Sequence, residues 1–297
     1  MKAYDLIRTD AELAALLSYL RGSRCVRVAI DMEGENNLHC YGIHVSLIQL
    51  FDGRRAFAVD ALSLESREPL RELLEGSGWL KVMFDAANDL LAFQHALDIR
   101  LAPIVDVAIA ARLLRMSGGL QALARQGGTA RSKDRFQRAN WMRRPLTKEM
   151  LDYAMGDVLP LLDLADSLME DLARKGLMFE FLARNWERQI AVRTWNPLAN
   201  YTRIPGYHGL SAADKRFARV LWHARENYAR QRNLTPESVA SKPQLKRIID
   251  HGLRDPEGIA EILNEGRDRP RIDTRDFGAR FAEAEREVDG KREVEGG

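Results

Sequence analysis

Residues 25–33 read Cys-Val-Arg-Val-Ala-Ile-Asp-Met-Glu, a run of apolar and β-branched side chains that ends on two acids. This composition predicts a buried β-strand. Side chains two residues apart on a strand point to the same face, so the carboxylates of Asp31 and Glu33 converge where the strand leaves the core. Two converging carboxylates suit a hard divalent cation, although the same pattern is also typical of a solvated strand end.

Outward from this strand, the pattern is that of an α/β domain. Strands are expected at residues 25–31, 44–50, 55–60, 80–84 and 104–107. The first three form an antiparallel meander, and helices alternate with the later ones, so the sheet is expected to be mixed and covered by helices. A long helical stretch covers residues 146–175, and Pro160 is expected to kink or restart it.

Length and composition limit the class of protein. The chain has 297 residues, which favours two domains, and it is 45% hydrophobic and 30% charged, the balance of a globular protein. No run approaches the roughly 18 uncharged apolar residues of a membrane helix. The amino end lacks the apolar segment of a secretory signal, so we expect a cytoplasmic protein without a membrane partner. Cys25 and Cys40 have no CxxC spacing and are interpreted as structural.

Charge is distributed unevenly along the chain. The formal net charge is only +2, yet residues 101–150 contain ten Lys and Arg against three acids, and residues 201–250 contain ten against four. Two basic segments within an acidic remainder favour a polyanionic partner, while solvated helix faces are the alternative reading.

Composition also predicts the domain boundaries. Residues 194–210 contain two prolines, two glycines and no regular apolar period, which indicates a linker between a first domain at 1–193 and a second at 211–290. The second domain is expected to be entirely helical, and the last residues, 291–297, are expected to be disordered.

Further acids follow the first pair. Asp89 lies in the first turn of an expected helix, directly after the strand at 80–84. Tyr153 and Asp157 lie four residues apart in the long helical stretch, so the phenol and the carboxylate share one helix face.

These residues resemble a known family. Asp31 and Glu33, then Asp89, then Tyr153 and Asp157 match in order and spacing the three motifs of the DEDD exonucleases, in the subgroup with a tyrosine in the third motif. The stretches Ala-Asn-Trp-Met-Arg-Arg-Pro-Leu-Thr at 139–147 and Tyr-Ala-Met-Gly-Asp-Val at 153–158 are similar to the ribonuclease D family. Leu-Trp-His-Ala-Arg at 221–225, with Ala229, Arg230, Pro236 and Leu245, resembles the helicase-and-RNase-D C-terminal (HRDC) domain.

The resemblance spans roughly residues 5–265 and implies a fold and an activity. It implies a ribonuclease H-like α/β exonuclease domain followed by a small all-α HRDC-like domain that binds nucleic acid. It also implies two divalent cations, Mg²⁺ or Mn²⁺. Asp31 would bridge them, Glu33 and Asp157 would complete the ion on the nucleophile side, Asp89 would hold the second ion, and Tyr153 would orient the attacking water. Nucleoside 5′-monophosphates would leave one at a time from a 3′ end.

The sequence departs from the family pattern at two motifs. Family members commonly carry histidine where this chain has Phe84, and the next residue, Asp85, is an acid that competes with Asp89 for the second motif. We favour Asp89, because its spacing from the preceding strand fits the motif. The first motif continues with Gly34 instead of an aromatic residue, which leaves more room beside the expected metal site.

The basic segment between the second and third motifs is the expected nucleic-acid contact. Lys and Arg neutralise backbone phosphates, and exposed aromatic rings stack on unpaired bases. Trp141 within this segment is interpreted as core. The residues expected to contact nucleic acid are Arg131, Lys133, Arg135, Arg138, Arg143, Arg144 and, in the helical domain, Arg225.

The leading hypothesis is a 3′ to 5′ exoribonuclease that trims structured RNA such as tRNA precursors at a free 3′ end. Two alternatives remain open: an exonuclease acting on single-stranded DNA, because the same carboxylates serve either sugar, and a catalytically weakened RNA-binding adaptor. No protein partner is inferable.

Overall fold

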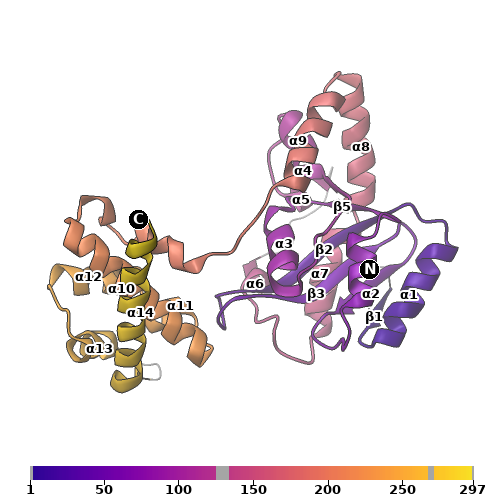
Figure 1. Ribbon diagram of the computed structural model, residues 1–297. Coiled ribbons are helices and arrows are strands. Elements are labelled where there is room, and N and C mark those ends of the chain that lie inside the picture. Colours follow the sequence, from indigo (N-terminus) through magenta and orange to yellow (C-terminus); the bar gives the residue numbers. More distant parts are fainter. Residues whose placement is uncertain (1–2, 125–133, 267–270, 296–297) are drawn as a thin grey trace. The chain divides into compact units, whose positions relative to one another are not determined.

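The computed structural model describes residues 3–124, 134–266 and 271–295, and the chain forms two compact units (Figure 1). The first unit comprises Met1–Glu35 and Ile43–Trp195, and the second comprises Asn36–Gly42 and Asn196–Gly297. The first unit is an α/β domain, and the second is helical.

A mixed sheet organises the first unit, as predicted. Its strands are β1 (Tyr4–Ile7), β2 (Arg27–Asn36), β3 (Ile43–Phe51), β4 (Ala56–Asp60), β5 (Leu80–Met83) and β6 (Ile104–Asp106). They lie in the order β1-β4-β3-β2-β5-β6, with β3 antiparallel to β4 and with β1/β4, β2/β5 and β5/β6 parallel. Strand β1 was not predicted, because a strand of four residues with a single buried side chain is too short to show an alternation of apolar and polar residues.

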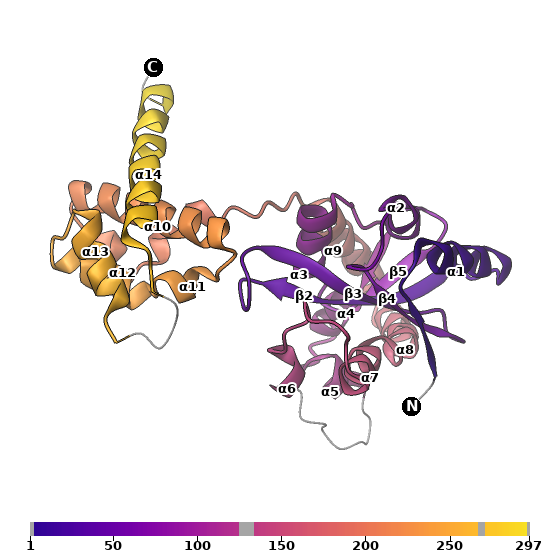
Figure 2. The ribbon, with the colours of Figure 1, turned by 90° about the horizontal axis from the view of Figure 1, so that it is seen from below.

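Helices cover both faces of this sheet (Figure 2). One face packs against α1 (Asp10–Gly22), α2 (Glu68–Glu75), α3 (Ala87–Ala92) and the π-helix η1 (Phe93–Leu97). The other packs against α4 (Val107–Leu113), α5 (Leu120–Ala124), α7 (Lys148–Val158) and α8 (Leu161–Arg174). Along β2, Val28 and Ile30 join the first core and Ala29 joins the second. The same alternation directs Asp31 and Glu33 to the face that α7 covers.

The long helical stretch is divided in two, as Pro160 indicated. The hydroxyl of Thr147 accepts a hydrogen bond from the Met150 amide and caps the start of α7. Pro160 is the N-cap residue of α8. Proline has no amide hydrogen to continue the ladder of α7, so a new helix begins there.

Arg144 fastens the segment between α6 (Asp134–Gln137) and α7 to the sheet. Its guanidinium donates to both carboxylate oxygens of Asp60, at 2.7 and 2.6 Å, and to the backbone oxygens of Trp141 and Ser46, at 2.7 and 3.1 Å. Asp60 is only 4% exposed. The donors of Arg144 are used inside the protein while its side chain stays 26% exposed, so its contact with nucleic acid remains a prediction.

The second unit contains α10 (Ala212–Arg232), α11 (Pro236–Val239), α12 (Lys242–Asp250), α13 (Pro256–Asn264) and α14 (Thr274–Glu295). The backbone of α14 is helical through Glu295, although disorder was expected from residue 291; residues 296–297 lie outside the described residues. Four buried apolar residues at helical spacing, Phe277, Phe281, Ala284 and Val288, give α14 a core-facing side that its charged composition concealed.

Acids of α14 pair with the basic side chains of α10. Arg216 binds Asp289 at 2.6 Å, and Arg232 binds Asp276 at 2.7 Å. The basic charge of this helix is therefore partly neutralised within the unit.

Arg225 is an interior residue of this unit. It is 3% exposed, its guanidinium binds Glu226 at 2.6 Å, and the guanidinium carbon lies 3.7 Å from the centroid of the Trp222 ring. Arg225 is therefore buried in this structure, and its contact with nucleic acid remains a prediction.

The segment between the two units has local structure. The helix α9 (Met178–Ile190) ends the α/β domain, and residues 194–210, expected as a linker, contain the 3-10 helices η2 (Pro197–Arg203) and η3 (Tyr207–Gly209). Among the residues that the structure describes, no helix is both long and apolar enough to cross a membrane.

The Arg144 contacts predict a stability effect. Arg144→Met leaves the buried Asp60 carboxylate without its cation, so we expect the free energy of unfolding to fall by about 3 kcal/mol. Urea denaturation measures this change. The neighbouring exposed residue provides a control, because Arg143→Met is expected to stay within about 0.5 kcal/mol of the wild type. Equal stability of the two variants would show that Arg144 does not fasten this segment.

Candidate active site

Three carboxylates meet at the end of β2. Oxygen atoms of Asp31, Glu33 and Asp157 all lie within 4.8 Å of one another, and all three residues are half-buried. Two come from one face of β2 and the third from α7, the helix that covers that face. The predicted convergence of the first and third motifs is present in the structure.

The helix α7 directs Tyr153 and Asp157 toward the site because its apolar positions pack into the second core. Leu151, Ala154, Met155 and Val158 are buried in the second core. Tyr153 and Asp157, one turn apart, are half-buried at the margin of that core. The packing of α7 therefore fixes the positions of the phenol and the carboxylate.

The structure distinguishes the two acids of the second motif. Asp89 lies in the first turn of α3 and is close enough to Asp31 that its charge raises the pKa of the Asp31 carboxyl. Asp85 is exposed, precedes α3 in a left-handed backbone conformation with φ 56°, and forms an ion pair with Arg112 at 3.4 Å. The two acids therefore do not share a helical face, and the position of Asp89 favours it as the second-motif acid.

Burial and mutual repulsion make this cluster electrostatically unfavourable without cations. Burial, followed by the charges of Asp89, Asp157 and Glu33, raises the pKa of Asp31 well above its ordinary value. Burial, with the nearby carboxylates of Asp106 and Asp85, raises the pKa of Asp89 to about 7. Hard oxygen donors that repel one another in a partly buried site fit divalent cations such as Mg²⁺ or Mn²⁺.

Tyr153 is placed to donate a hydrogen bond. Its ring packs between Phe136 and Trp141, with centroid separations of 5.3 and 6.3 Å. Burial and the charges of Glu33, Asp157 and Asp31 raise the pKa of the phenol. The phenol therefore keeps its proton at neutral pH and can orient a water molecule, but it cannot act as a base. Trp141 is 2% exposed, which confirms its interpretation as core.

Gly34 is required where β2 approaches β3. A Cβ atom at this position would lie 2.1 Å from the backbone oxygen of His44, so a larger residue does not fit directly after Glu33. The departure from the family pattern at Gly34 thus has a packing cause. Phe84, the other departure, is half-buried against the second core.

The expected nucleic-acid contacts fall into three groups. Arg138 and Arg143 are exposed. Arg131 and Lys133, together with the side chain of Arg135, lie outside the described residues. Arg144 and Arg225 are held by acids within the protein, as described above.

Comparison with known families agrees with this site. The model of the 3′-5′ exonuclease family matches residues 4–173, which include all four carboxylates of this site. The chain belongs to this exonuclease family.

Within this family, the chain is similar in sequence to ribonucleases D. The chain is 30% identical over 246 residues to ribonuclease D of Haemophilus influenzae, covering 80% of this chain and 60% of that protein. It is 27% identical over 274 residues to ribonuclease D of Serratia proteamaculans, covering 91% and 71%. The chain covers 46% to 60% of the length of the first four ribonuclease D relatives.

Two solved structures share the fold. Escherichia coli RNase D, described as an exoribonuclease involved in structured RNA processing, superposes with a TM-score of 0.72 at 22% identity, covering 95% of this chain and 75% of that chain. The catalytic core of RRP6 from Trypanosoma brucei superposes with a TM-score of 0.76 at 20% identity, covering 97% and 80%. These likenesses establish the ribonuclease H-like exonuclease fold.

The raised carboxyl pKa values predict that cation binding releases protons. Below pH 7 Asp89 is mainly protonated in the metal-free protein, and a bound cation must displace that proton. Because the pKa of Asp31 is raised as well, we expect about one proton or more to be released per protein at pH 6 and fewer at pH 8.5. Titration calorimetry with Mn²⁺, in buffers of different ionisation enthalpy, measures this number.

Two variants locate the proton. Asp89→Asn is expected to lower the release at pH 6, whereas Asp85→Asn, which alters an exposed acid, is expected to retain it. Wild-type release from Asp89→Asn would contradict this assignment.

Proposed function

We propose that the protein is a metal-dependent 3′ to 5′ exoribonuclease of the ribonuclease D type. It would bind a free RNA 3′ end, hydrolyse the terminal phosphodiester bond with the help of two divalent cations, Mg²⁺ or Mn²⁺, and release nucleoside 5′-monophosphates. Structured RNA, including tRNA precursors, is the proposed substrate class, and the cytoplasm is the proposed location.

The observation that carries this proposal is the convergence of Asp31, Glu33 and Asp157 within 4.8 Å, with Asp89 close enough to raise the pKa of Asp31. A protein that only binds RNA has no use for three carboxylates whose charges raise the pKa of a fourth, Asp31. Such a cluster is stable in its ionised form only with cations, and those cations are the means of cleaving a phosphodiester.

Each residue has a role in this scheme. Asp31 faces the other three acids and would contact both cations, Glu33 and Asp157 would hold one of them, and Asp89 would hold the other. When bound, the two cations would activate water and stabilise the departing 3′ oxygen. Tyr153 would donate its phenolic proton to orient the attacking water.

RNA is favoured as the substrate on two grounds. Arg138 and Arg143 present positive charge beside the residues that pack around Tyr153, where a phosphate backbone would enter. The two curated relatives compared above are ribonucleases D. The helical unit, proposed to be HRDC-like, would guide nucleic acid. In this structure Arg225 is buried, and Arg216 and Arg232 of α10 pair with acids of the same unit.

Cleavage of end-labelled oligonucleotides tests the proposal. We incubate the protein with 5′-labelled single-stranded RNA or DNA of the same sequence, with Mg²⁺, Mn²⁺ or EDTA. A ladder shortening from the 3′ end of RNA, absent with EDTA, is expected. A stronger ladder on DNA would favour the DNA exonuclease, and RNA that is bound but intact with every metal would favour the adaptor.

Substitution of one ligand tests the site itself. Asp157→Asn keeps the shape of the side chain but removes a charged ligand, so we expect cleavage to fall by about 10²-fold or more, while RNA affinity in EDTA changes little. The matched control is Asp163→Asn, which alters an exposed acid of α8. Wild-type cleavage by Asp157→Asn, or equal losses in both variants, would refute the assigned site.

A further inference from the structure

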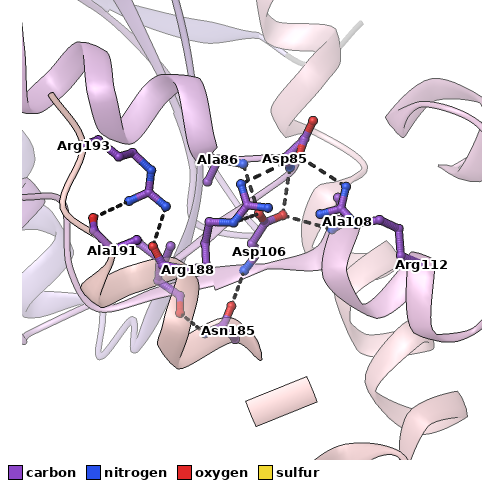
Figure 3. A network of polar contacts seen from close by, with 10 residues as sticks. Asp85, Ala86, Asp106, Ala108, Arg112, Asn185, Arg188, Ala191 and Arg193 are labelled. Atoms are coloured by element: carbon purple, nitrogen blue, oxygen red, sulfur yellow. Dashed lines mark hydrogen bonds and ion pairs between the residues drawn. The ribbon is translucent and has the colours of Figure 1, made fainter. Parts of the chain in front are cut away.

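Asp106, at the end of β6, is a fully buried carboxylate with an unusual set of partners (Figure 3). Its oxygens accept hydrogen bonds from the backbone amides of Asp85 at 2.8 Å and Ala86 at 3.2 Å. A third bond, from the Ala108 amide at 3.1 Å, caps the start of α4. One buried side chain thus connects the edge of the sheet to the turn that precedes α3.

That turn determines where Asp89 lies. Asp85 adopts a left-handed conformation that only a minority of non-glycine residues reach. Ala86, the N-cap residue of α3, supplies no side-chain hydrogen bond of its own. Two successive amides directed at one carboxylate form an anion-binding turn, so Asp106 performs the capping that the local sequence does not. Asp89 follows within one helical turn.

The helix α9 holds Asp106 in turn. The side chain of Asn185 accepts from the Asp106 amide and donates to the Ile104 oxygen, both at 2.8 Å, and Gln189 accepts from the Ile104 amide at 2.8 Å. These bonds occupy the outer edge of β6, the last strand in the sheet order, as another strand would. Residue 185 lies beyond the 4–173 match to the exonuclease family.

Arg188 lies on α9 one turn after Asn185 and supplies the positive charge that faces the Asp106 carboxylate. Its Nε atom lies 3.6 Å from the Asp106 carboxylate, and its guanidinium lies 4.0 Å from Asp85. Only 20% of the Arg188 side chain is exposed. Without this cation, Asp106 would be a buried charge beside the acids of the active site, and its two amide contacts would be less favourable.

We propose that Asn185, Arg188 and Asp106 are positioning residues for Asp89: α9 fixes Asp106, Asp106 fixes the turn at Asp85 and Ala86, and that turn directs Asp89 toward Asp31. This inference rests on the proposed function, because it assigns to residues outside the family motifs the task of positioning Asp89, a proposed cation ligand. Outer partners of this kind commonly change metal affinity or activity by 10- to 100-fold when removed.

Hydrogen exchange of the metal-free protein tests the connection without any cleavage assay. The Asp85 and Ala86 amides bond to different oxygens of Asp106, so Asp106→Asn, which replaces one oxygen with an amide group that cannot accept, leaves one of these two amides without its acceptor. We expect exchange in a peptide covering residues 84–92 to accelerate about tenfold, while exchange in β3 stays at the wild-type rate. Wild-type exchange at 84–92 in this variant would overturn the proposal.

Cation affinity and catalysis give the second readout. Arg188→Met is expected to weaken Mn²⁺ binding about tenfold and to lower kcat more than it raises KM, and Arg188→Lys is expected to recover most of the loss. The control is Arg184→Met, one turn earlier on α9, where the arginine pairs with Glu180 at the surface. Mn²⁺ affinity and exchange at 84–92 that are unchanged in Arg188→Met would also overturn the proposal.

The two hypotheses fail differently. If the proposed function is wrong, the wild type neither binds Mn²⁺ at this site nor cleaves RNA, yet Asp106→Asn still accelerates exchange at 84–92. If the positioning is wrong, the wild type binds and cleaves while exchange at 84–92 is the same in every variant. Should Asp106→Asn fail to fold, the exchange and Mn²⁺ data on Arg188→Met decide the matter.

Discussion

Repulsion among carboxylates is the constraint on which the rest of the structure depends. Asp31 faces Asp89, Asp157 and Glu33 in a partly buried site, and their charges raise the pKa of its carboxyl. Folding brings these groups together against their electrostatic preference. The apolar packing of two elements, β2 in the sheet and α7 against it, therefore holds the acids in place, and the cost of doing so is lowered by protons or by cations.

Different parts of the structure hold the different acids of the site in place. The second core fixes α7, and with it Tyr153 and Asp157, through the buried side chains on the other faces of the helix. Asp89 lies in the first turn of α3, which continues directly into η1 and has no capping side chain at its start. The support for α3 comes from Asp106 and α9 instead. The helix that carries Asp157 is capped by its own Thr147, whereas the helix that carries Asp89 depends on a distant carboxylate. We therefore expect the site to be most sensitive to change on the Asp89 side.

Local patterns in the sequence predicted much of this site. Alternation along residues 25–33 placed Asp31 and Glu33 on one face, and helical spacing placed Tyr153 beside Asp157. The pairing of Asp89 with the other motifs came from resemblance, because no local pattern separates it from Asp85. The left-handed turn that sets the two acids apart is held by Asp106, twenty residues further along the chain, and such a contact leaves no local signal.

The sequence did not predict which basic residues are available to a ligand. Arg143 and Arg144 are adjacent arginines, yet only the second is bound to the buried Asp60 carboxylate among the contacts described above. Arg225 was expected at a surface because of its charge, but Glu226 and Trp222 hold it in the interior. Long-range pairing, which decides whether an arginine is available to a ligand, depends on tertiary contacts that composition does not encode.

Anomalous diffraction from crystals soaked in Mn²⁺ tests the central claim most directly. The account predicts two peaks about 4 Å apart, one in contact with Glu33 and Asp157, the other with Asp89, and both within reach of Asp31. Crystals of Asp157→Asn should lose the first peak. Peaks located elsewhere, or no peak among these four acids at Mn²⁺ concentrations that support activity, would contradict the account.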